Sequence, residues 1–328
     1  MGTVLSGMRP TGLLHLGHYE GVIRNWLELQ KTEKCFFFVA DLHALTDRTK
    51  NDEIGKWSIE MVKDWLALGI DPNRATIFVQ SHVPAHAELS ALFGMVTPVS
   101  WLERCPTYKD RTLQLGEGSE NLGLLSYPVL MSADIAVYGA DKVPVGEDQV
   151  VHLELAREII RRFNSHYPGS NLVEPQPLLT KASKLMGTDG RKMSKSYGNT
   201  LELSAAIEAT SKRIRGMKTD EARKLRADPG EPLRCNLYPY HEIYSPDKTD
   251  EIQSGCRSAA LGCVDCKKIL FENLVSHFEE YRKKRNQLSD EEVIEIIKCG
   301  AERARMAAEA VMVRIRNAIK MLPAEKAE

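Results

Sequence analysis

Residues 35–40, CFFFVA, form an unbroken apolar run that decides the fold class of this chain. A β-strand that is covered on both faces has this pattern, whereas a strand with one wet face alternates apolar and polar residues. A similar run, ATIFVQ, occupies residues 75–80, and a shorter one lies at residues 3–6. Helical patterns over about residues 17–31 and about residues 52–68 separate the three runs. This order predicts an α/β fold with a doubly wound parallel sheet.

The pattern changes after about residue 200. Strand-like runs become rare and helical periodicity dominates, apart from a stretch rich in proline and cysteine over residues 228–266. A last long helix is expected over about residues 290–321. The sequence therefore predicts two domains, residues 1–200 with the parallel sheet and residues 201–328 with a helical fold.

The composition is that of an ordinary globular protein, with 43% hydrophobic and 27% charged residues. No apolar run approaches the roughly 20 residues of a membrane span, and residues 1–18 lack the pattern of a secretory signal. We therefore expect a cytoplasmic protein without a membrane partner. The net charge of −1 creates no general attraction for nucleic acid, and we expect no DNA partner. Basic residues gather locally at 212–226 and 282–285, although solvated helix faces are the simpler explanation on charge alone.

Residues 15–18, HLGH, form the turn between the first strand and the first helix. Ligands of open parallel sheets bind at the carboxyl ends of strands, and free N–H groups at a helix start attract phosphates. Gly17 would let the backbone approach a nucleotide closely, and the two imidazoles could donate hydrogen bonds to phosphate oxygens. A loop with two exposed histidines explains the tetrapeptide alone equally well.

Residues 190–196, GRKMSKS, lie in a loop bounded by Gly187 and Gly198. Two lysines and two serines between glycine hinges suit a mobile clamp on a polyphosphate. An ordinary basic surface loop is the alternative for this segment alone. The segment does not match the Walker A pattern, so a P-loop is not indicated.

Together the two segments resemble the HIGH and KMSKS signatures of class I aminoacyl-tRNA synthetases, with Leu16 in place of isoleucine. Segments 6–18, 39–46, 69–89, 127–164 and 189–199 are similar to bacterial tryptophanyl-tRNA synthetases, so the resemblance covers nearly the whole chain. It departs modestly at Leu5, where the family often has an aromatic residue, and at Ser132, where it often has alanine. The resemblance implies a Rossmann-like catalytic domain at residues 1–200 and a domain for tRNA anticodon recognition at residues 201–328.

The activity that the resemblance implies is tryptophan–tRNA ligation. L-Tryptophan and ATP would form tryptophanyl-adenylate and pyrophosphate, and the tryptophanyl group would then pass to the 3′ end of tRNA(Trp). Two alternatives are a tyrosyl-tRNA synthetase, which shares both signatures, and a non-catalytic relative that binds RNA or senses redox state through a metal cluster. The resemblance also implies a homodimer.

The resemblance assigns the catalytic roles to His15, His18, Lys192 and Lys195. It assigns ATP contacts to a larger set, namely Arg9, Pro10, Thr11, Gly17, His18, Gly146, Glu147, Asp148, Leu185, Lys192, Met193, Ser194, Lys195 and Ser196. Mg²⁺ is expected on the phosphates of ATP rather than in a protein cage.

Tyr127, Met131 and Asp134 are spaced so that they share one face of a helix, with Pro128 expected in its first turn. This face offers an aromatic wall, a polarisable filler and a carboxylate, while an indole needs an apolar slot and one acceptor. A core helix with a capped aspartate explains the spacing as well. The resemblance assigns the indole N–H to Asp134 and the amino group of tryptophan to Tyr127 and Gln149.

Four of the seven cysteines lie close together in the sequence as Cys235, Cys256, Cys263 and Cys266, with the spacing C-x20-C-x6-C-x2-C. Four thiols in so short a segment of a cytosolic chain suggest a metal site, and the spacing alone does not separate Zn²⁺ from a [4Fe–4S] cluster. Some bacterial tryptophanyl-tRNA synthetases carry a [4Fe–4S] cluster on a similar pattern. The resemblance therefore favours a [4Fe–4S] cluster, with Zn²⁺ as the alternative.

Overall fold

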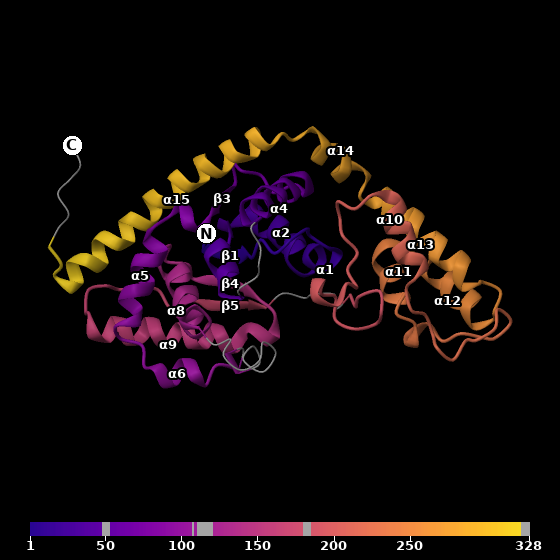
Figure 1. The fold of residues 1–328 in the computed structure, drawn as a ribbon, viewed down its shortest axis with the longest axis horizontal. Helices are drawn as coiled ribbons and strands as arrows, with labels where there is room; N and C mark the ends of the chain where they lie inside the picture. The colour runs from indigo at the N-terminus through magenta and orange to yellow at the C-terminus, as the bar shows by residue number, and fades with distance from the viewer. Residues whose placement is uncertain (48–52, 107, 110–120, 180–184, 323–328) are drawn as a thin grey trace. The chain divides into compact units, whose positions relative to one another are not determined.

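The computed structural model describes residues 1–47, 53–106, 108–109, 121–179 and 185–322 (Figure 1). The chain divides into two compact units. The first comprises Met1–Gly12, Trp26–Lys181 and Ser289–Glu328, and the second comprises Leu13–Asn25 and Ala182–Leu288. This partition differs from the expected division at residue 200, because the chain enters the second unit twice and returns to the first for its last helix.

The first unit is built on a parallel sheet of five strands in the order β3-β2-β1-β4-β5. The strands are β1 (Thr3–Met8), β2 (Lys34–Val39), β3 (Ala75–Val79), β4 (Lys142–Val145) and β5 (Gln176–Leu179). The apolar run at residues 35–40 supplies most of β2, whose three phenylalanines are at most 5% exposed. The predicted doubly wound parallel sheet is confirmed, and its strand order reverses between β1 and β4.

Helices pack around this sheet. They are α2 (Arg24–Thr32), α3 (Asp41–Ala44), α4 (Ile54–Leu68), α5 (Ala85–Gly94), α6 (Val99–Glu103), α8 (Leu122–Ala136) and α9 (Val150–His166). Short 3-10 turns lie at η2 (Leu45–Asp47), η3 (Gln80–His82) and η4 (Glu147–Gln149). The Trp26 ring stacks on Phe37 with 4.2 Å between centroids, and Trp65 meets Trp26 edge-on. These buried rings anchor α2 and α4 on β2.

The last helix, α15 (Asp290–Ile319), packs against β3 (Figure 1). Its first turn is closed by a capping box, in which the Glu292 N–H donates to the Ser289 hydroxyl and the Ser289 N–H donates to the Glu292 carboxylate. Its buried face carries alanines and larger apolar residues that join the core of the first unit. The long C-terminal helix that the sequence predicts is therefore part of the sheet unit.

The second unit is helical in its described part. It contains α1 (Leu16–His18), the π-helical turn η1 (Tyr19–Ile23), η5 (Lys195–Tyr197), α10 (Ile207–Arg215), η6 (Pro232–Arg234), α11 (Tyr238–Tyr244), η7 (Pro246–Lys248), α12 (Thr249–Arg257), α13 (Cys263–His277) and α14 (Glu279–Gln287). Helix α13 packs against both α10 and α11. Across the described residues of both units, no helix combines the length and the apolar character needed to cross a membrane.

Candidate active site

The HLGH and KMSKS segments lie beside each other within the second unit. The Leu16 N–H donates to the Leu201 carbonyl at 2.9 Å, so the start of α1 pairs with the chain that follows KMSKS. A Cβ on Gly17 would stand 3.0 Å from the His15 ring and 3.5 Å from the Met193 sulfur. The structure therefore brings together two segments that are far apart in the sequence and that the resemblance assigns to ATP.

Both imidazoles of HLGH are held neutral. The His15 and His18 rings are stacked with 3.6 Å between their centroids, and the His15 backbone N–H donates to His18 Nδ1 at 3.3 Å. Burial and the charge of Lys195 lower the pKa of His15 to about 4. Burial, with the neighbouring His15 and Lys195, also lowers the pKa of His18 well below its usual value. At neutral pH these rings offer N–H donors without adding positive charge. The neighbouring ammonium group of Lys195 supplies that charge.

The KMSKS loop is organised by Asn199, a residue that the sequence patterns do not single out. Asn199 is 2% exposed and donates to Asp189 Oδ1 at 2.7 Å and to the Lys192 carbonyl at 3.1 Å. Its own amide oxygen accepts from the Ser194 N–H at 2.8 Å. Gly187 is required at the base of the loop, because a Cβ there would overlap the Asn199 amide and stand 2.8 Å from its carbonyl oxygen. These hydrogen bonds of Asn199 hold the loop together. Within the loop, Lys192 is exposed and Lys195 is half-buried.

The remaining residues that the resemblance assigns to ATP are divided between the units. Arg9, Pro10 and Thr11 directly follow β1, and Gly146 and Glu147 directly follow β4. These are the two strands between which the strand order reverses, the place where parallel sheets bind nucleotides. Asp148 lies in η4, and its side chain falls outside the described part of the structure. Leu185 belongs to the second unit and is 7% exposed.

The three residues assigned to tryptophan on one helix lie on α8, as their spacing predicts. Asp134 is buried, while Tyr127 and Met131 are half-buried, and Gln149 lies exposed in η4. The position expected for Pro128 is wrong. Helix α8 begins at Leu122, because the Asn121 side chain caps it by accepting from the Leu124 N–H at 2.8 Å. Pro128 therefore lies inside the helix rather than in its first turn.

Asp134 already has three side-chain partners from three other elements. His43 of α3 places Nε2 2.9 Å from Oδ2, and His86 of α5 places Nδ1 2.7 Å from Oδ1. Gln80 of η3, directly after β3, donates to both oxygens, at 2.8 and 2.9 Å. Burial favours the neutral acid, but the hydrogen bonds from His43 and His86 outweigh it and hold the pKa of Asp134 at about 2. The carboxylate is therefore ionised and acts only as an acceptor.

Sequence reasoning did not single out His43, Gln80 or His86. His43 and Gln80 follow the carboxyl ends of β2 and β3, where parallel sheets place their functional side chains, so this position was an available signal. The partner of all three, Asp134, is at least 48 residues away in the sequence. Only the assembled sheet shows that they surround one carboxylate.

The four clustered cysteines lie in one region of the second unit, each half-buried. Burial, followed by the neighbouring thiols of Cys235, Cys256 and Cys263, raises the pKa of Cys266 to about 12. Its sulfur lies 3.2 Å from His241 Nε2. Among the described residues, no three or more histidine, cysteine or acidic side chains converge as ligands of one ion. The thiols thus suit a soft metal by their number and chemistry, while their described positions do not form a ready-made site.

Comparisons with known proteins identify the family. Residues 2–279 match the family model described as tRNA synthetases class I (W and Y). A tryptophan–tRNA ligase of Thermotoga maritima is 45% identical, over 97% of this chain and 99% of the relative, and one of Ralstonia nicotianae is 40% identical, over 96% and 98%. The crystal structure of tryptophanyl-tRNA synthetase from Campylobacter jejuni, complexed with ADP and tryptophan, is similar with a TM-score of 0.89. It is 32% identical and covers 97% of this chain and 100% of its own. The chain therefore belongs to the tryptophanyl-tRNA synthetases of class I.

Proposed function

We propose that this tryptophan–tRNA ligase activates L-tryptophan through the paired HLGH and KMSKS segments and selects it through Asp134. A carboxylate oxygen of tryptophan attacks the α-phosphorus of ATP and forms a new O–P bond. The bond between the α-phosphorus and the oxygen that bridges it to the β-phosphorus breaks, and that oxygen leaves as part of pyrophosphate. No enzyme nucleophile is needed, so catalysis consists of positioning and charge stabilisation. The observation that carries this proposal is the approach of HLGH and KMSKS within the second unit.

The histidines and the lysines of the two segments would have different roles, because the histidines are neutral and the lysines are charged. His15 and His18 are neutral, so they would donate N–H groups to phosphate oxygens without binding ATP by charge. Lys192 and Lys195 would supply positive charge to the departing pyrophosphate. Mg²⁺ on the phosphates of ATP would add charge neutralisation and needs no carboxylate cage on the protein.

Tryptophan would be selected on α8. The ionised Asp134 would accept the indole N–H, Met131 would line the apolar slot, and Tyr127 with Gln149 would contact the amino group. A buried acceptor that loses its donor costs binding energy, so phenylalanine would be rejected strongly. This selection is chemical, because it depends on one N–H group rather than on size.

ATP–pyrophosphate exchange measured separately with tryptophan, tyrosine and phenylalanine tests this proposal. We expect exchange that depends on tryptophan, followed by charging of tRNA(Trp) with purified components. Exchange that depends on tyrosine would establish the tyrosyl alternative instead. A folded protein without exchange on any amino acid would establish the non-catalytic alternative.

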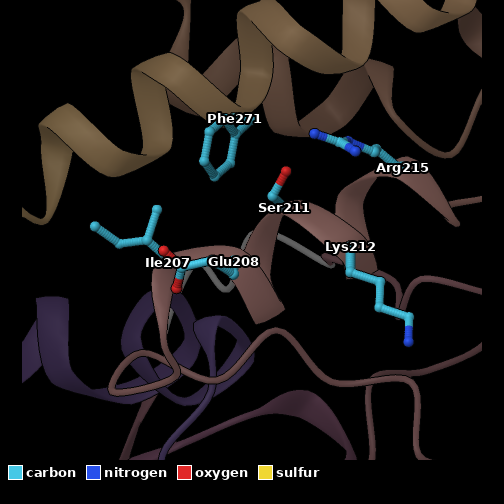
Figure 2. Close-up of a pocket in the computed structure, with 6 residues that line it drawn as sticks. All are labelled: Ile207, Glu208, Ser211, Lys212, Arg215 and Phe271. Carbon is cyan, nitrogen blue, oxygen red and sulfur yellow. The ribbon is translucent and has the colours of Figure 1, made fainter.

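A groove between α10 and α13 supports RNA contact by the second unit. Its volume is about 490 Å³, and Figure 2 shows Phe271 of α13 facing the side of α10 that carries Ser211. The lining residues are Ile207, Glu208, Ser211, Lys212, Arg215 and Phe271. Among the described residues, the side chains of Lys212 and Arg215 form no ion pair, so their charges are open to an anion. An aromatic ring beside such cations is how proteins hold a base and its phosphates.

The other basic segment is less suited to RNA. Lys283 pairs with Glu279 at 2.6 Å and Lys284 pairs with Glu280 at 2.8 Å, both one turn earlier on α14. These pairs compensate much of the local charge. We therefore propose that the α10–α13 groove, rather than residues 282–285, contacts tRNA(Trp).

We further propose that Cys235, Cys256, Cys263 and Cys266 hold a [4Fe–4S] cluster, with Zn²⁺ as the alternative. Burial raises the pKa of Cys235, Cys256 and Cys266, and a metal cation would compensate the thiolate charge that burial disfavours. The cluster would order the segments around α13. A homodimer is also proposed, and light scattering should return twice the mass of one chain.

A further inference from the structure

His86 connects Asp134 to the interior of the sheet unit. It is fully buried, with Nδ1 2.7 Å from Asp134 Oδ1 and Nε2 2.7 Å from the Tyr138 hydroxyl. Its ring therefore links two other buried polar groups, and none of the roles proposed above uses it. A buried histidine with both nitrogens engaged is costly unless both hydrogen bonds are correctly directed.

One assignment of protons gives each of the three groups its proper partner. Asp134 is ionised and can only accept, so His86 Nδ1 carries a hydrogen and donates it. Burial and the charge of Asp134 raise the pKa of Tyr138, so its hydroxyl keeps its proton. That proton needs an acceptor, and His86 Nε2 provides it in the tautomer that carries its hydrogen on Nδ1. Tyr138 thus fixes the tautomer that donates to Asp134.

The packing around His86 leaves its ring little freedom. Phe38 and Phe78 lie with their centroids 6.0 and 5.9 Å from the His86 ring, and Tyr138 is at 5.4 Å. Tyr138 is itself stacked on Phe36 at 4.5 Å. Strands β2 and β3 therefore hold the ring, and the ring holds one oxygen of the carboxylate.

The partners of Asp134 differ in how easily they can be displaced. A carboxylate offers roughly four acceptor positions, and His86, Gln80 and His43 already occupy most of them. His86 and Gln80 are fully buried, whereas the side chain of His43 is 13% exposed. Oδ1 has only buried partners, His86 and Gln80, whereas Oδ2 accepts from Gln80 and from the partly exposed His43. Oδ2 is therefore the oxygen at which an arriving N–H group could replace or join His43.

We propose that His86, backed by Tyr138, is a positioning residue that holds Asp134 so that Oδ2 faces the indole N–H of tryptophan. This inference rests on the proposed role of Asp134 as the indole acceptor. It assigns to two buried residues a part in substrate selection, although neither contacts the substrate. Its consequence is that their loss weakens the recognition of one N–H group rather than the pocket in general.

The test compares tryptophan with benzothienylalanine, in which sulfur replaces the indole N–H while the size is nearly kept. The measured quantity is the ratio of kcat/KM for the two substrates in ATP–pyrophosphate exchange. In His86→Leu this ratio should fall by about 10-fold or more, mainly through the KM for tryptophan, because the acceptor is no longer oriented. His86→Asn should recover part of the loss, because its amide nitrogen can take the place of Nδ1. Tyr138→Phe should lower the ratio by a smaller factor, about 3-fold.

Each outcome decides the proposal. Equal losses of kcat/KM for both substrates in a folded His86→Leu variant would show a merely structural role and overturn it. If circular dichroism shows that His86→Leu does not fold, Tyr138→Phe carries the test, and an unchanged ratio in that variant overturns the proposal.

Asp134→Ala separates this inference from the proposed function. An unchanged substrate ratio in a folded Asp134→Ala variant would remove Asp134 as the indole acceptor, and the role of His86 with it. A reduced ratio in Asp134→Ala together with unchanged ratios in the His86 and Tyr138 variants would keep the acceptor and reject the positioning role alone.

Discussion

Gly300 of α15 lies directly against the backbone of Ile77 in β3, where a Cβ would stand 2.7 Å from the Ile77 carbonyl carbon and would overlap its oxygen. Only a residue without a side chain allows the helix to approach the strand this closely. The contact joins the last helix of the chain to the sheet that is formed from its first 179 residues. The stability of the first unit should therefore depend on this one glycine.

Gly300→Ala should destabilise the protein by about 2 kcal/mol or more, because α15 must move away from β3. Gly55→Ala in α4 is the matched control, since among the described residues no atom outside the local helix backbone lies within 4 Å of the position its Cβ would take. That change should be neutral or stabilise the protein by up to about 1 kcal/mol, because alanine favours the helix. Thermal unfolding followed by circular dichroism measures both. Equal shifts of the unfolding temperature in the two variants would contradict the close contact between Gly300 and Ile77.

The sequence predicts this architecture well where the pattern is local. The apolar run at residues 35–40 predicts β2, and the helical pattern over about residues 52–68 predicts α4. Helix α4 ends at Leu68, where Gly69 follows in the left-handed conformation that glycine favours. The return of α15 to the sheet could not be predicted from periodicity, since an apolar face does not say which surface covers it. Periodicity also could not predict that Leu13–Asn25 and Ala182–Leu288 belong to one unit.

The pKa of His15 predicts a specific pH dependence of stability. Its folded-state pKa is about 4 against an ordinary value of 6.5, so between these values the unfolded chain binds a proton that the folded chain does not. The contribution of the buried, neutral His15 ring to the free energy of unfolding is complete above pH 6.5 and is lost as the pH falls towards 4. The size of this loss is at most about 3 kcal/mol. His18 acts in the same direction.

His15→Gln should therefore flatten the loss of stability between pH 6.5 and pH 4, as measured by urea unfolding at several pH values. His82→Gln, at an exposed histidine, serves as the control and should keep the wild-type slope. A His15→Gln protein with the full wild-type slope would show that burial does not hold this imidazole neutral.

The α10–α13 groove predicts an effect on tRNA without an effect on the first step. Lys212→Ala with Arg215→Ala should raise the KM for tRNA(Trp) by about 10-fold and reduce the slope of log affinity against log salt by about 1 to 2, because two phosphate contacts are lost. Phe271→Ala should weaken binding by about 1–3 kcal/mol if a base stacks on the ring. Tryptophan-dependent pyrophosphate exchange should stay unchanged in all of these variants.

Lys283→Ala with Lys284→Ala is the matched control for the groove, because it removes the same number of charges from α14. Both lysines are paired with glutamates, so this variant should bind tRNA(Trp) with nearly wild-type affinity and salt dependence. Equal losses in the two double variants would mean that general charge, rather than the groove, attracts the RNA.

Sequence reasoning places some candidate site residues on common elements and cannot assemble others. Tyr127, Met131 and Asp134 share a helix, so their spacing alone predicts a common face. Pro128 misled the placement of the helix start, because the Asn121 cap begins α8 at Leu122 and leaves the proline in the helix interior, where proline is usually unfavourable. The partners of Asp134 lie on α3, η3 and α5, and no spacing rule links them to α8.

The cysteine cluster yields the prediction that separates metal binding from adenylate chemistry. Anaerobically purified protein should show the broad visible absorption of an iron–sulfur cluster and about four irons per chain. Cys263→Ser should lose this metal, because a serine oxygen is a poor replacement for a thiolate on iron. Cys299→Ser is the matched control, since Cys299 is exposed on α15 outside the cluster and its loss should leave the metal content unchanged.

The same variants decide what the metal does for the enzyme. Cys263 and Cys266 open α13, whose later turn carries Phe271, so loss of the metal should loosen the helix that forms one side of the groove. Cys263→Ser should therefore charge tRNA(Trp) more slowly, while tryptophan-dependent exchange stays near the wild-type rate if circular dichroism shows that the fold is kept. Bound zinc without iron in the wild-type protein would establish the Zn²⁺ alternative, and reduced thiols without either metal would remove the site. A folded Cys263→Ser protein that loses exchange and charging equally would show that the cluster supports the KMSKS loop instead, because both belong to the second unit.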